Sequence, residues 1–152
     1  MRYFIILSFV AGVFLSCKKD KFSSEPQITY KSLKGNFYDA TVTGGNFAYP
    51  SINFNITDAE GDIDTDSARI YIKNLKYNTM DSLQFPNLAS AKSKNFKAEV
   101  NASVEKITKS PGGTGGTIII LDTIFYEIYV RDQAKNKSNV IKTSDPVYFR
   151  HR

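Results

Sequence analysis

The residues best suited to binding chemistry lie in one acidic segment, where carboxylates occupy every second position from Asp58 to Asp66. Such closely spaced charges repel one another unless water or a cation neutralises them. A loop rich in carboxylate oxygens suits a hard cation such as calcium. The segment therefore predicts a calcium site, with Asp132 joining from the turn after another strand. Its candidate ligands are Asp58, Glu60, Asp62, Asp64 and Asp132.

The spacing of these acids differs from that of an EF-hand loop. Counted from Asp58, glycine stands at the fourth position instead of the sixth, and Arg69 stands at the twelfth, where an EF-hand has a bidentate Glu. An ion here needs another geometry. The alternative is an acidic turn without metal, in which Gly61 adopts a positive φ and Asp58 or Asp62 accepts hydrogen bonds from nearby backbone amides. The sequence leaves both interpretations open.

Few residues of the chain are suited to catalysis. It contains one cysteine, Cys17, one histidine, His151, and no tryptophan. His151 is the next-to-last residue, where chain ends are usually loose, so we expect neither a serine triad nor a histidine zinc site. Hydrolysis by a pair of carboxylates remains compatible with the supply of acids. We predict that the protein is not an enzyme.

Cys17 follows a pattern typical of a secretory signal. Arg2 and an apolar stretch over residues 4–14 precede it, and this stretch is shorter than the roughly 20 residues that a membrane-spanning helix needs. Residues 14–17, Phe-Leu-Ser-Cys, resemble the lipobox of bacterial lipoproteins, which implies cleavage before Cys17 and lipid attachment to its sulfur. We expect a signal peptide over residues 1–16 and lipidation of Cys17. An ordinary signal peptide that leaves a free thiol is the alternative.

Beyond a polar tether over residues 17–27, apolar residues alternate with polar ones as they do in half-buried strands. The pattern predicts strands at residues 52–57, 70–73, 117–121 and 125–130. Residues 95–107 fit both a strand period and a helical face, and we favour a strand. The glycine-rich residues 110–116 predict a mobile hairpin connection. These features predict one all-β domain over residues 28–152, an antiparallel β-sandwich of about seven strands.

Two short motifs resemble a known group of proteins. Residues 52–63 (INFNITDAEGDI) and residues 131–139 (RDQAKNKSN) are similar to a strand with an Asp-rich turn and to a hairpin turn in Bacteroidota lipoproteins that have an immunoglobulin-like or cadherin-like sandwich. Lys135 stands where that group has a turn glycine, so a left-handed backbone is less favourable there. The resemblance implies an immunoglobulin-like fold and an outer-membrane location, and no reaction.

The side of the membrane is not decided by the sequence. In that lipoprotein group, acidic residues just after the cysteine tend to mark export to the cell surface, whereas Lys18 and Lys19 follow Cys17 here. The periplasmic face and the cell surface therefore both remain open. In either location the lipid on Cys17 makes the membrane the first expected partner.

The positive charge of the chain is spread along its length. The formal net charge is +5, and the lysines form no dense run. This distribution predicts no nucleic-acid partner; it favours solubility, with a mild attraction to anionic lipid headgroups as an alternative. The chain has nine tyrosines, and an exposed cluster of them is the first place to look for a partner.

Two functional hypotheses follow from these observations. The first is a non-catalytic binding or structural module of an outer-membrane assembly, which contacts an envelope protein or a glycan. The second is a calcium-dependent adhesin-like or carbohydrate-binding domain, in which the acidic loop orders the surface that meets the ligand.

Overall fold

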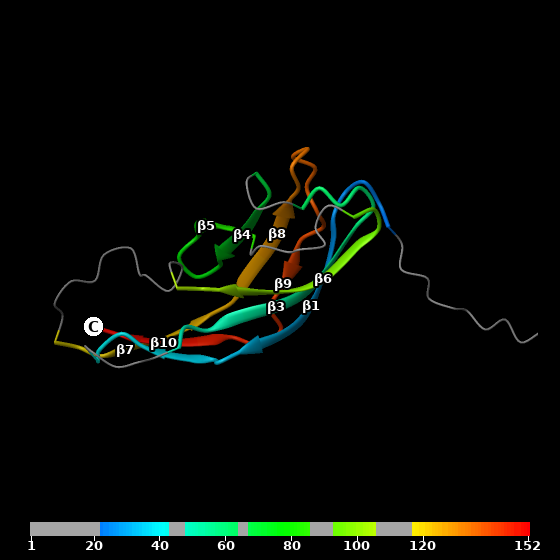
Figure 1. Ribbon diagram of the computed structural model, residues 1–152. Coiled ribbons are helices and arrows are strands. Elements are labelled where there is room, and N and C mark those ends of the chain that lie inside the picture. The colour runs from blue at the N-terminus through cyan, green and yellow to red at the C-terminus, as the bar shows by residue number, and fades with distance from the viewer. Residues whose placement is uncertain (1–21, 43–47, 64–66, 86–92, 106–116) are drawn as a thin grey trace, which may run out of the picture.

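The computed structural model describes residues 22–42, 48–63, 67–85, 93–105 and 117–152, and these residues form strands and turns without a helix (Figure 1). Within these ranges there are ten strands: β1 (Gln27–Lys34), β2 (Phe37–Asp39), β3 (Ser51–Asp58), β4 (Arg69–Asn74), β5 (Thr79–Gln84), β6 (Phe96–Ser103), β7 (Ile120–Ile124), β8 (Tyr126–Arg131), β9 (Ile141–Lys142) and β10 (Val147–His151). No helix in the described part is long and apolar enough to cross a membrane. The prediction of an all-β domain is confirmed.

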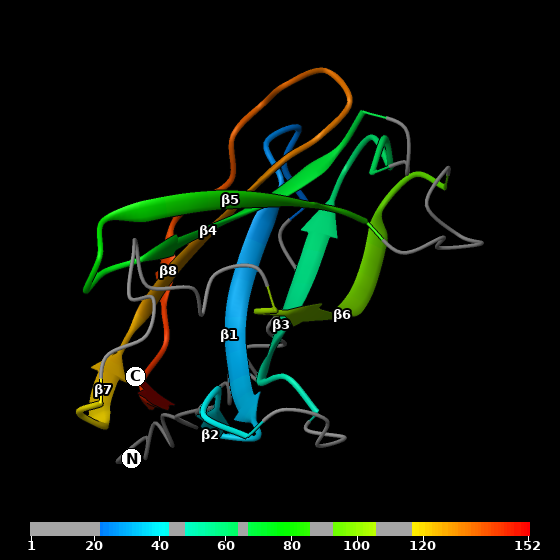
Figure 2. The same cartoon turned by 90° about the vertical axis from the view of Figure 1, so that its left-hand side faces the viewer.

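The strands pair in three sheets, with orders β1-β3-β6, β2-β10-β7 and β5-β4-β8-β9. Only Phe125 separates β7 from β8, so the second and third sheets continue into one another (Figure 2). All three sheets contribute to one hydrophobic core, which gives a β-sandwich. In three places, β1/β2, β7/β8 and β9/β10, consecutive strands follow one another after a short interruption. When each of these is counted as one strand, the total is seven, as expected.

Alternation along β3 builds the centre of this core. Ile52, Phe54 and Ile56 are completely buried, whereas Asn53 and Asn55 point to the other face and are half-buried. Burying a large apolar side chain stabilises a fold by roughly 1.5–3 kcal/mol. The two-residue period therefore fixes which face of β3 packs inward, as the sequence predicts.

Two strand predictions had different outcomes. The ambiguous residues 95–107 contain β6, which confirms the strand over the helix. The strand expected at residues 117–121 has the wrong bounds, because β7 begins at Ile120 and extends to Ile124. Its ladder with β10 ends where Ile120 lies opposite His151, so this pairing does not continue to earlier residues. The prediction for residues 110–116 lies outside the described residues.

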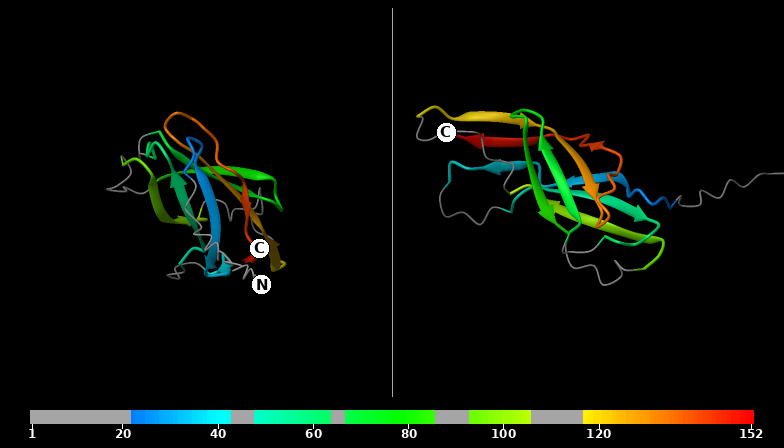
Figure 3. Two further views of the ribbon diagram at one scale, coloured as in Figure 1. Left: turned by 90° about the vertical axis from the view of Figure 1, so that its right-hand side faces the viewer. Right: turned by 90° about the horizontal axis from the view of Figure 1, so that it is seen from above.

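The expectation of a loose chain end at His151 is wrong. His151 is the last residue of β10, which pairs with β7 on one side and with β2 on the other (Figure 3). Its side chain is buried, and its ring stacks on Phe149 with the ring centroids 4.8 Å apart. Sheet pairing therefore fixes this residue in place.

Candidate metal centre

Three of the predicted ligands converge at one end of the sandwich. Asp58 is the last residue of β3, Asp62 lies in the loop after it, and Asp132 follows β8 in another sheet. Each offers a carboxylate oxygen, and these oxygens lie within 4.8 Å of one another. Calcium binds oxygen at about 2.3–2.6 Å, so a single ion between the three carboxylates can contact all of them.

Gly61 shapes the first of the two loops. Its φ of 69° lies in the left-handed region, and a Cβ on this residue would approach the backbone oxygen of Ser93 to 2.0 Å. Only glycine fits such a position. The resulting turn directs the amides of Gly61 and Asp62 to Oδ2 of Asp58, at 2.7 and 3.3 Å. These are the features that a purely structural acidic turn requires.

Asp132 organises the second loop in the same way. Its Oδ1 accepts a hydrogen bond from the amide of Asn136 at 2.7 Å, and its Oδ2 accepts one from Nδ2 of Asn136 at 2.9 Å. Lys135 has a φ of 69°, so this lysine adopts the left-handed backbone that favours glycine. An L-residue in that conformation costs about 1–2 kcal/mol, which the surrounding hydrogen bonds must offset.

The two loops also bind each other directly. The carbonyl of Asp62 accepts a hydrogen bond from the amide of Gln133 at 3.1 Å. Oδ2 of the same residue accepts one from the amide of Ala134, also at 3.1 Å. Asp62 is therefore the bridge that brings the acids of the first loop to Asp132.

These hydrogen bonds leave part of the cluster unsatisfied. Oδ1 of Asp58 and Oδ1 of Asp62 are buried, and neither has a hydrogen-bond partner among the described residues. The Asp58 side chain is completely buried. Leaving a buried acceptor without a partner costs about 1–3 kcal/mol, and more for a charged group.

The electrostatics of the cluster favour a cation. Burial raises the pKa of Asp58 to about 6, and the charge of Asp62 adds to this effect, while the amides of Gly61 and Asp62 oppose it. Burial also raises the pKa of Asp132; the hydrogen bonds from Asn136 oppose this shift, and the charges of Asp62 and Glu60 reinforce it. The carboxylates therefore destabilise one another's charged forms, and a bound cation would relieve this repulsion.

The remaining predicted site residues are placed differently. Glu60 is exposed and does not belong to the group of three close carboxylates, although its charge acts on Asp132. Asp64 lies outside the described residues, and so does the expected lipidation site, Cys17.

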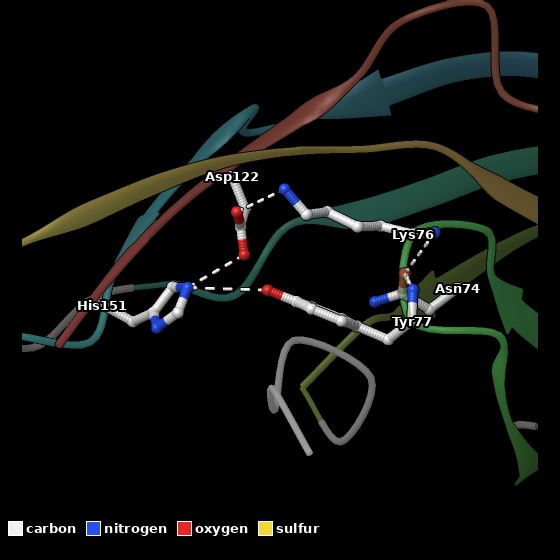
Figure 4. Close-up of polar contacts among 5 residues, drawn as sticks. All are labelled: Asn74, Lys76, Tyr77, Asp122 and His151. Carbon is white, nitrogen blue, oxygen red and sulfur yellow. Dashed lines mark hydrogen bonds and ion pairs between the residues drawn. The ribbon is translucent and has the colours of Figure 1, made fainter. Parts of the chain in front are cut away.

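A second polar cluster, which the sequence analysis missed, surrounds Asp122 of β7 (Figure 4). Nε2 of His151 lies 2.9 Å from Oδ2 of Asp122, and Nζ of Lys76 forms an ion pair with Oδ1. The hydroxyl of Tyr77 lies 3.5 Å from the same nitrogen of His151. Oδ1 of Asn74 accepts hydrogen bonds from the amides of Lys76 and Tyr77, at 3.0 and 3.1 Å, and so holds their turn in place.

This second cluster has a structural role. Burial of Asp122 acts to raise its pKa, but the hydrogen bonds and charges of Lys76 and His151 outweigh burial and lower it. The charged carboxylate thus attaches the end of β10 and the turn after β4 to β7. No local sequence signal reveals the cluster, because its members come from segments far apart in the chain.

Comparison of the chain with protein-family models, with curated proteins and with solved structures finds no match. Relatives therefore supply no ligand, partner or activity for it. The described ligand set itself consists of carboxylate oxygens alone, which is the chemistry that hard cations prefer over the thiolates and imidazoles of soft-metal sites.

Proposed function

We propose that the chain is a non-catalytic, lipid-anchored envelope protein of the Bacteroidota type. Its immunoglobulin-like sandwich would bind one calcium ion between Asp58, Asp62 and Asp132. The ion would stiffen the loops through which the module meets an envelope protein or a glycan. One observation carries the calcium proposal: two buried carboxylate oxygens in a cluster of three acids lack a hydrogen-bond partner among the described residues.

The strand order supports the immunoglobulin-like assignment. The sheet β1-β3-β6 packs against the layer that the other two sheets form, with strand orders β2-β10-β7 and β5-β4-β8-β9. In the three sheets β2 runs parallel to β10, and all other neighbouring strands are antiparallel. Greek-key sandwiches of this kind place their loops at the two ends. The acidic cluster occupies one such end.

Calcium would act here as a clamp between sheets. Asp58 ends β3 in one sheet, and Asp132 follows β8 in another, so an ion shared by both would join the two layers. Oδ1 of Asp58 and Oδ1 of Asp62 are both buried, so calcium would need further oxygen ligands from water or from a bound partner. In the adhesin-like or carbohydrate-binding alternative, a ligand oxygen would replace one of these waters.

Thermal melting with and without calcium tests this proposal. We expect the mature chain, from residue 17 with Cys17→Ser, to melt at a higher temperature when about 10 mM calcium is present. Extracellular calcium modules have dissociation constants near 0.1–1 mM, so saturation stabilises by about 2 kcal/mol, which corresponds to roughly 5–10 °C. An unchanged melting temperature at this concentration would refute calcium binding.

The variant Asp58→Asn distinguishes an ion site from a structural turn. An amide at this position keeps an acceptor for the Gly61 amide and removes one charge from the cluster. In EDTA we expect the variant to be at least as stable as the parent chain, and in calcium to be less stable. Glu99→Gln, on the outer face of β6 away from the cluster, is the matched control and should respond to calcium as the parent does. Destabilisation of Asp58→Asn to the same extent in both conditions would contradict the ion site.

A further inference from the structure

One strand of the sandwich extends beyond the strand that pairs with it. Along β8 the chain lies beside β4, and just past this ladder the amide of Leu75 donates a hydrogen bond to the carbonyl of Phe125 at 3.0 Å. After Leu75 the chain turns back into β5, whereas β7 continues the line of β8 (Figures 1 and 2). Among the described residues, β7 is therefore paired with β10 on one side and with no strand on the other.

The bonds between β10 and β2 show how the backbone of β10 is turned. The amide of Tyr148 donates to the carbonyl of Asn36 at 2.7 Å, and the carbonyl of Arg150 accepts from the amide of Ala40 at 2.8 Å. Tyr148 and Arg150 thus direct their backbone groups toward β2. Successive residues of a strand direct these groups to opposite sides, so the residues that alternate with them bond to β7.

The same alternation identifies the backbone groups of β7 that have no partner strand. The β10 residues that face β7 are in register with Ile120, Asp122 and Ile124. The amides and carbonyls of Leu121 and Thr123, which alternate with these residues, therefore point to the open side. Phe125 belongs to the same alternate set, and its bond to Leu75 lies on that side.

Apolar side chains accompany this open edge. Residues 118–121, three isoleucines and a leucine, are each between 44% and 74% exposed. Together they present about 500 Å² of apolar surface, which is as large as the largest patch on a typical monomer and often marks an interaction site. The one charge in β7, on Asp122, is buried and forms an ion pair with Lys76, so it does not oppose an approaching strand.

The other sheet edges that the structure describes are protected. β6 carries exposed Lys97 and Glu99, and β5 carries the half-buried Asp81. The side chain of Asn139 covers β1, because it donates to the carbonyl of Ile28 and accepts from its amide. β2 and β9 have only three and two residues. Such features prevent edge-to-edge pairing, whereas β7 has five residues, no exposed charge and, in the described part of the chain, no cover.

The open edge of β7 is complementary to itself. When two copies lie antiparallel with Leu121 opposite Leu121 of the second copy, Ile119 lies opposite Thr123 of the second copy. Each of these residues then exchanges both of its backbone hydrogen bonds with the residue opposite, so no amide or carbonyl on the open side is left over. The side chains meet as apolar or β-branched cross-strand pairs, which stabilise a sheet.

We propose that two copies of the chain form a symmetric dimer through antiparallel pairing of their β7 edges about Leu121. The two sheets of order β2-β10-β7 become one sheet of six strands. About 500 Å² from each copy gives about 1,000 Å² in all, which is the lower limit for a specific protein interface. The pairing consumes both open edges and leaves only protected ones, so the assembly closes at two copies.

This inference is independent of the proposed function. β7 joins one end of β8 and Asp132 follows the other, so the dimer edge and the acidic cluster lie at opposite ends of this line of strands (Figure 1). Dimerisation therefore needs neither calcium nor the lipid at Cys17.

Analytical ultracentrifugation of the mature chain with Cys17→Ser measures this association, and this substitution removes the only cysteine. Small interfaces are usually weak, so we expect the average mass to rise from one chain toward two between about 1 and 200 μM. The rise should be the same in calcium and in EDTA. A mass of one chain over the whole range would overturn the inference, even if the edge bound an unrelated β-strand peptide, and so would a dimer that forms only with calcium.

A lysine at the dimer axis tests where the two copies meet. Leu121→Lys places like charges directly opposite one another and should weaken the dimer about tenfold or more. The matched control is Val140→Lys, because Val140 is 50% exposed, compared with 59% for Leu121, and lies outside β7. It should leave the dissociation constant within about twofold of the parent value. Equal effects of the two substitutions would contradict pairing through β7.

Thr123→Pro tests the contribution of the backbone. Proline lacks the amide that points to the open side, and its ring blocks that edge, while the bonds from β7 to β10 stay intact. We therefore expect this variant to be a folded monomer at concentrations where the parent chain is a dimer. Circular dichroism and thermal melting check the fold of each variant. A folded proline variant that dimerises as the parent does would overturn the antiparallel pairing.

A disulfide tests the register. Opposite residues in a hydrogen-bonded antiparallel pair have Cα atoms about 5.5 Å apart, which suits a disulfide. In the Cys17→Ser chain, Leu121→Cys should therefore give a disulfide-linked dimer on mild oxidation, whereas Val140→Cys should remain single. Equal cross-linking of the two variants would place the contact elsewhere and overturn the inference.

Discussion

At the scale of single residues, Asp58 combines two roles. One of its oxygens accepts hydrogen bonds from the loop amides, and the other is buried without a partner among the described residues. The first role explains why an acid ends β3. The second role is the observation on which the calcium proposal rests.

The pKa of Asp58 predicts how the metal-free domain responds to pH. Burial raises this pKa to about 6 in the folded state. Protonation of Asp58 therefore stabilises the fold fully below about pH 4, and this stabilisation is lost as pH rises through about 6. At about 1.4 kcal/mol for each pKa unit, the loss is about 3 kcal/mol. Denaturant unfolding in EDTA at pH 4.5 and 7.5 measures it. Asp58→Asn should reduce the difference between the free energies of unfolding at the two pH values. If the variant and the parent chain showed the same pH dependence, its assignment to Asp58 would be wrong.

Asp122 has the opposite pH dependence. Its folded pKa is lowered, so the stability that it provides is present above about pH 4 and is lost as pH falls through the folded value. Asp122→Asn removes the charge that Lys76 and His151 share, and we expect about 2 kcal/mol of destabilisation at pH 7. Unfolding of the variant at pH 7 and pH 3 measures this loss, which should shrink at the lower pH.

The exposed pair of Lys31 and Glu99 provides the comparison for Asp122. Both of these side chains are 50% exposed, so Glu99→Gln should change stability by less than about 1 kcal/mol. If Glu99→Gln destabilised the protein as much as Asp122→Asn does, the cluster around Asp122 would not have the structural role assigned to it.

At the scale of the elements, the loops matter more than the strands for the candidate site. The strands β3 and β8 deliver Asp58 and Asp132 to one end of the molecule, and Gly61 and Lys135 supply the left-handed backbone that turns each loop inward. The loops then bind each other through Asp62. Calcium affinity should therefore depend on loop geometry as much as on the acids.

Two glycine substitutions test this dependence. Gly61→Ala combines a positive φ with a collision against Ser93, so we expect it to destabilise the domain by about 3 kcal/mol or more and to weaken calcium binding. Gly35→Ala has a similar φ of 68°, but the added Cβ would lie 3.9 Å from its nearest neighbour in Pro50. This control should cost only about 1 kcal/mol and leave calcium binding intact. Chemical unfolding and calcium titration of both variants measure the two effects.

Local pattern predicted the elements well and their long-range partners poorly. The alternation in β3 is a property of that strand alone, and it predicted correctly that Ile52, Phe54 and Ile56 face inward. The approach of Asp132 to Asp58 was foreseen because an acid directly follows a strand pattern. The contact of His151 with Asp122 depends on the register between β7 and β10, which no local sequence reveals.

At the scale of the whole molecule, the carboxylate cluster lies at the end of the sandwich where the N-terminal segment enters. Hydrogen bonds from Ala59 to Ser23 and from Asn136 to Ser24 join the two loops to that segment. An ion in the cluster would stiffen the end of the domain nearest the proposed anchor at Cys17. We therefore expect the stability of this end to depend on calcium and that of the distant end not to.

A crystal structure of the mature chain grown in calcium would show whether the three aspartates hold an ion. We expect an anomalous-difference peak between them, with at least one oxygen of each of Asp58, Asp62 and Asp132 at about 2.3–2.6 Å from it. Those oxygens should include Oδ1 of Asp58, which has no partner among the described residues. A site that holds only water at saturating calcium, with no such peak, would refute the calcium site.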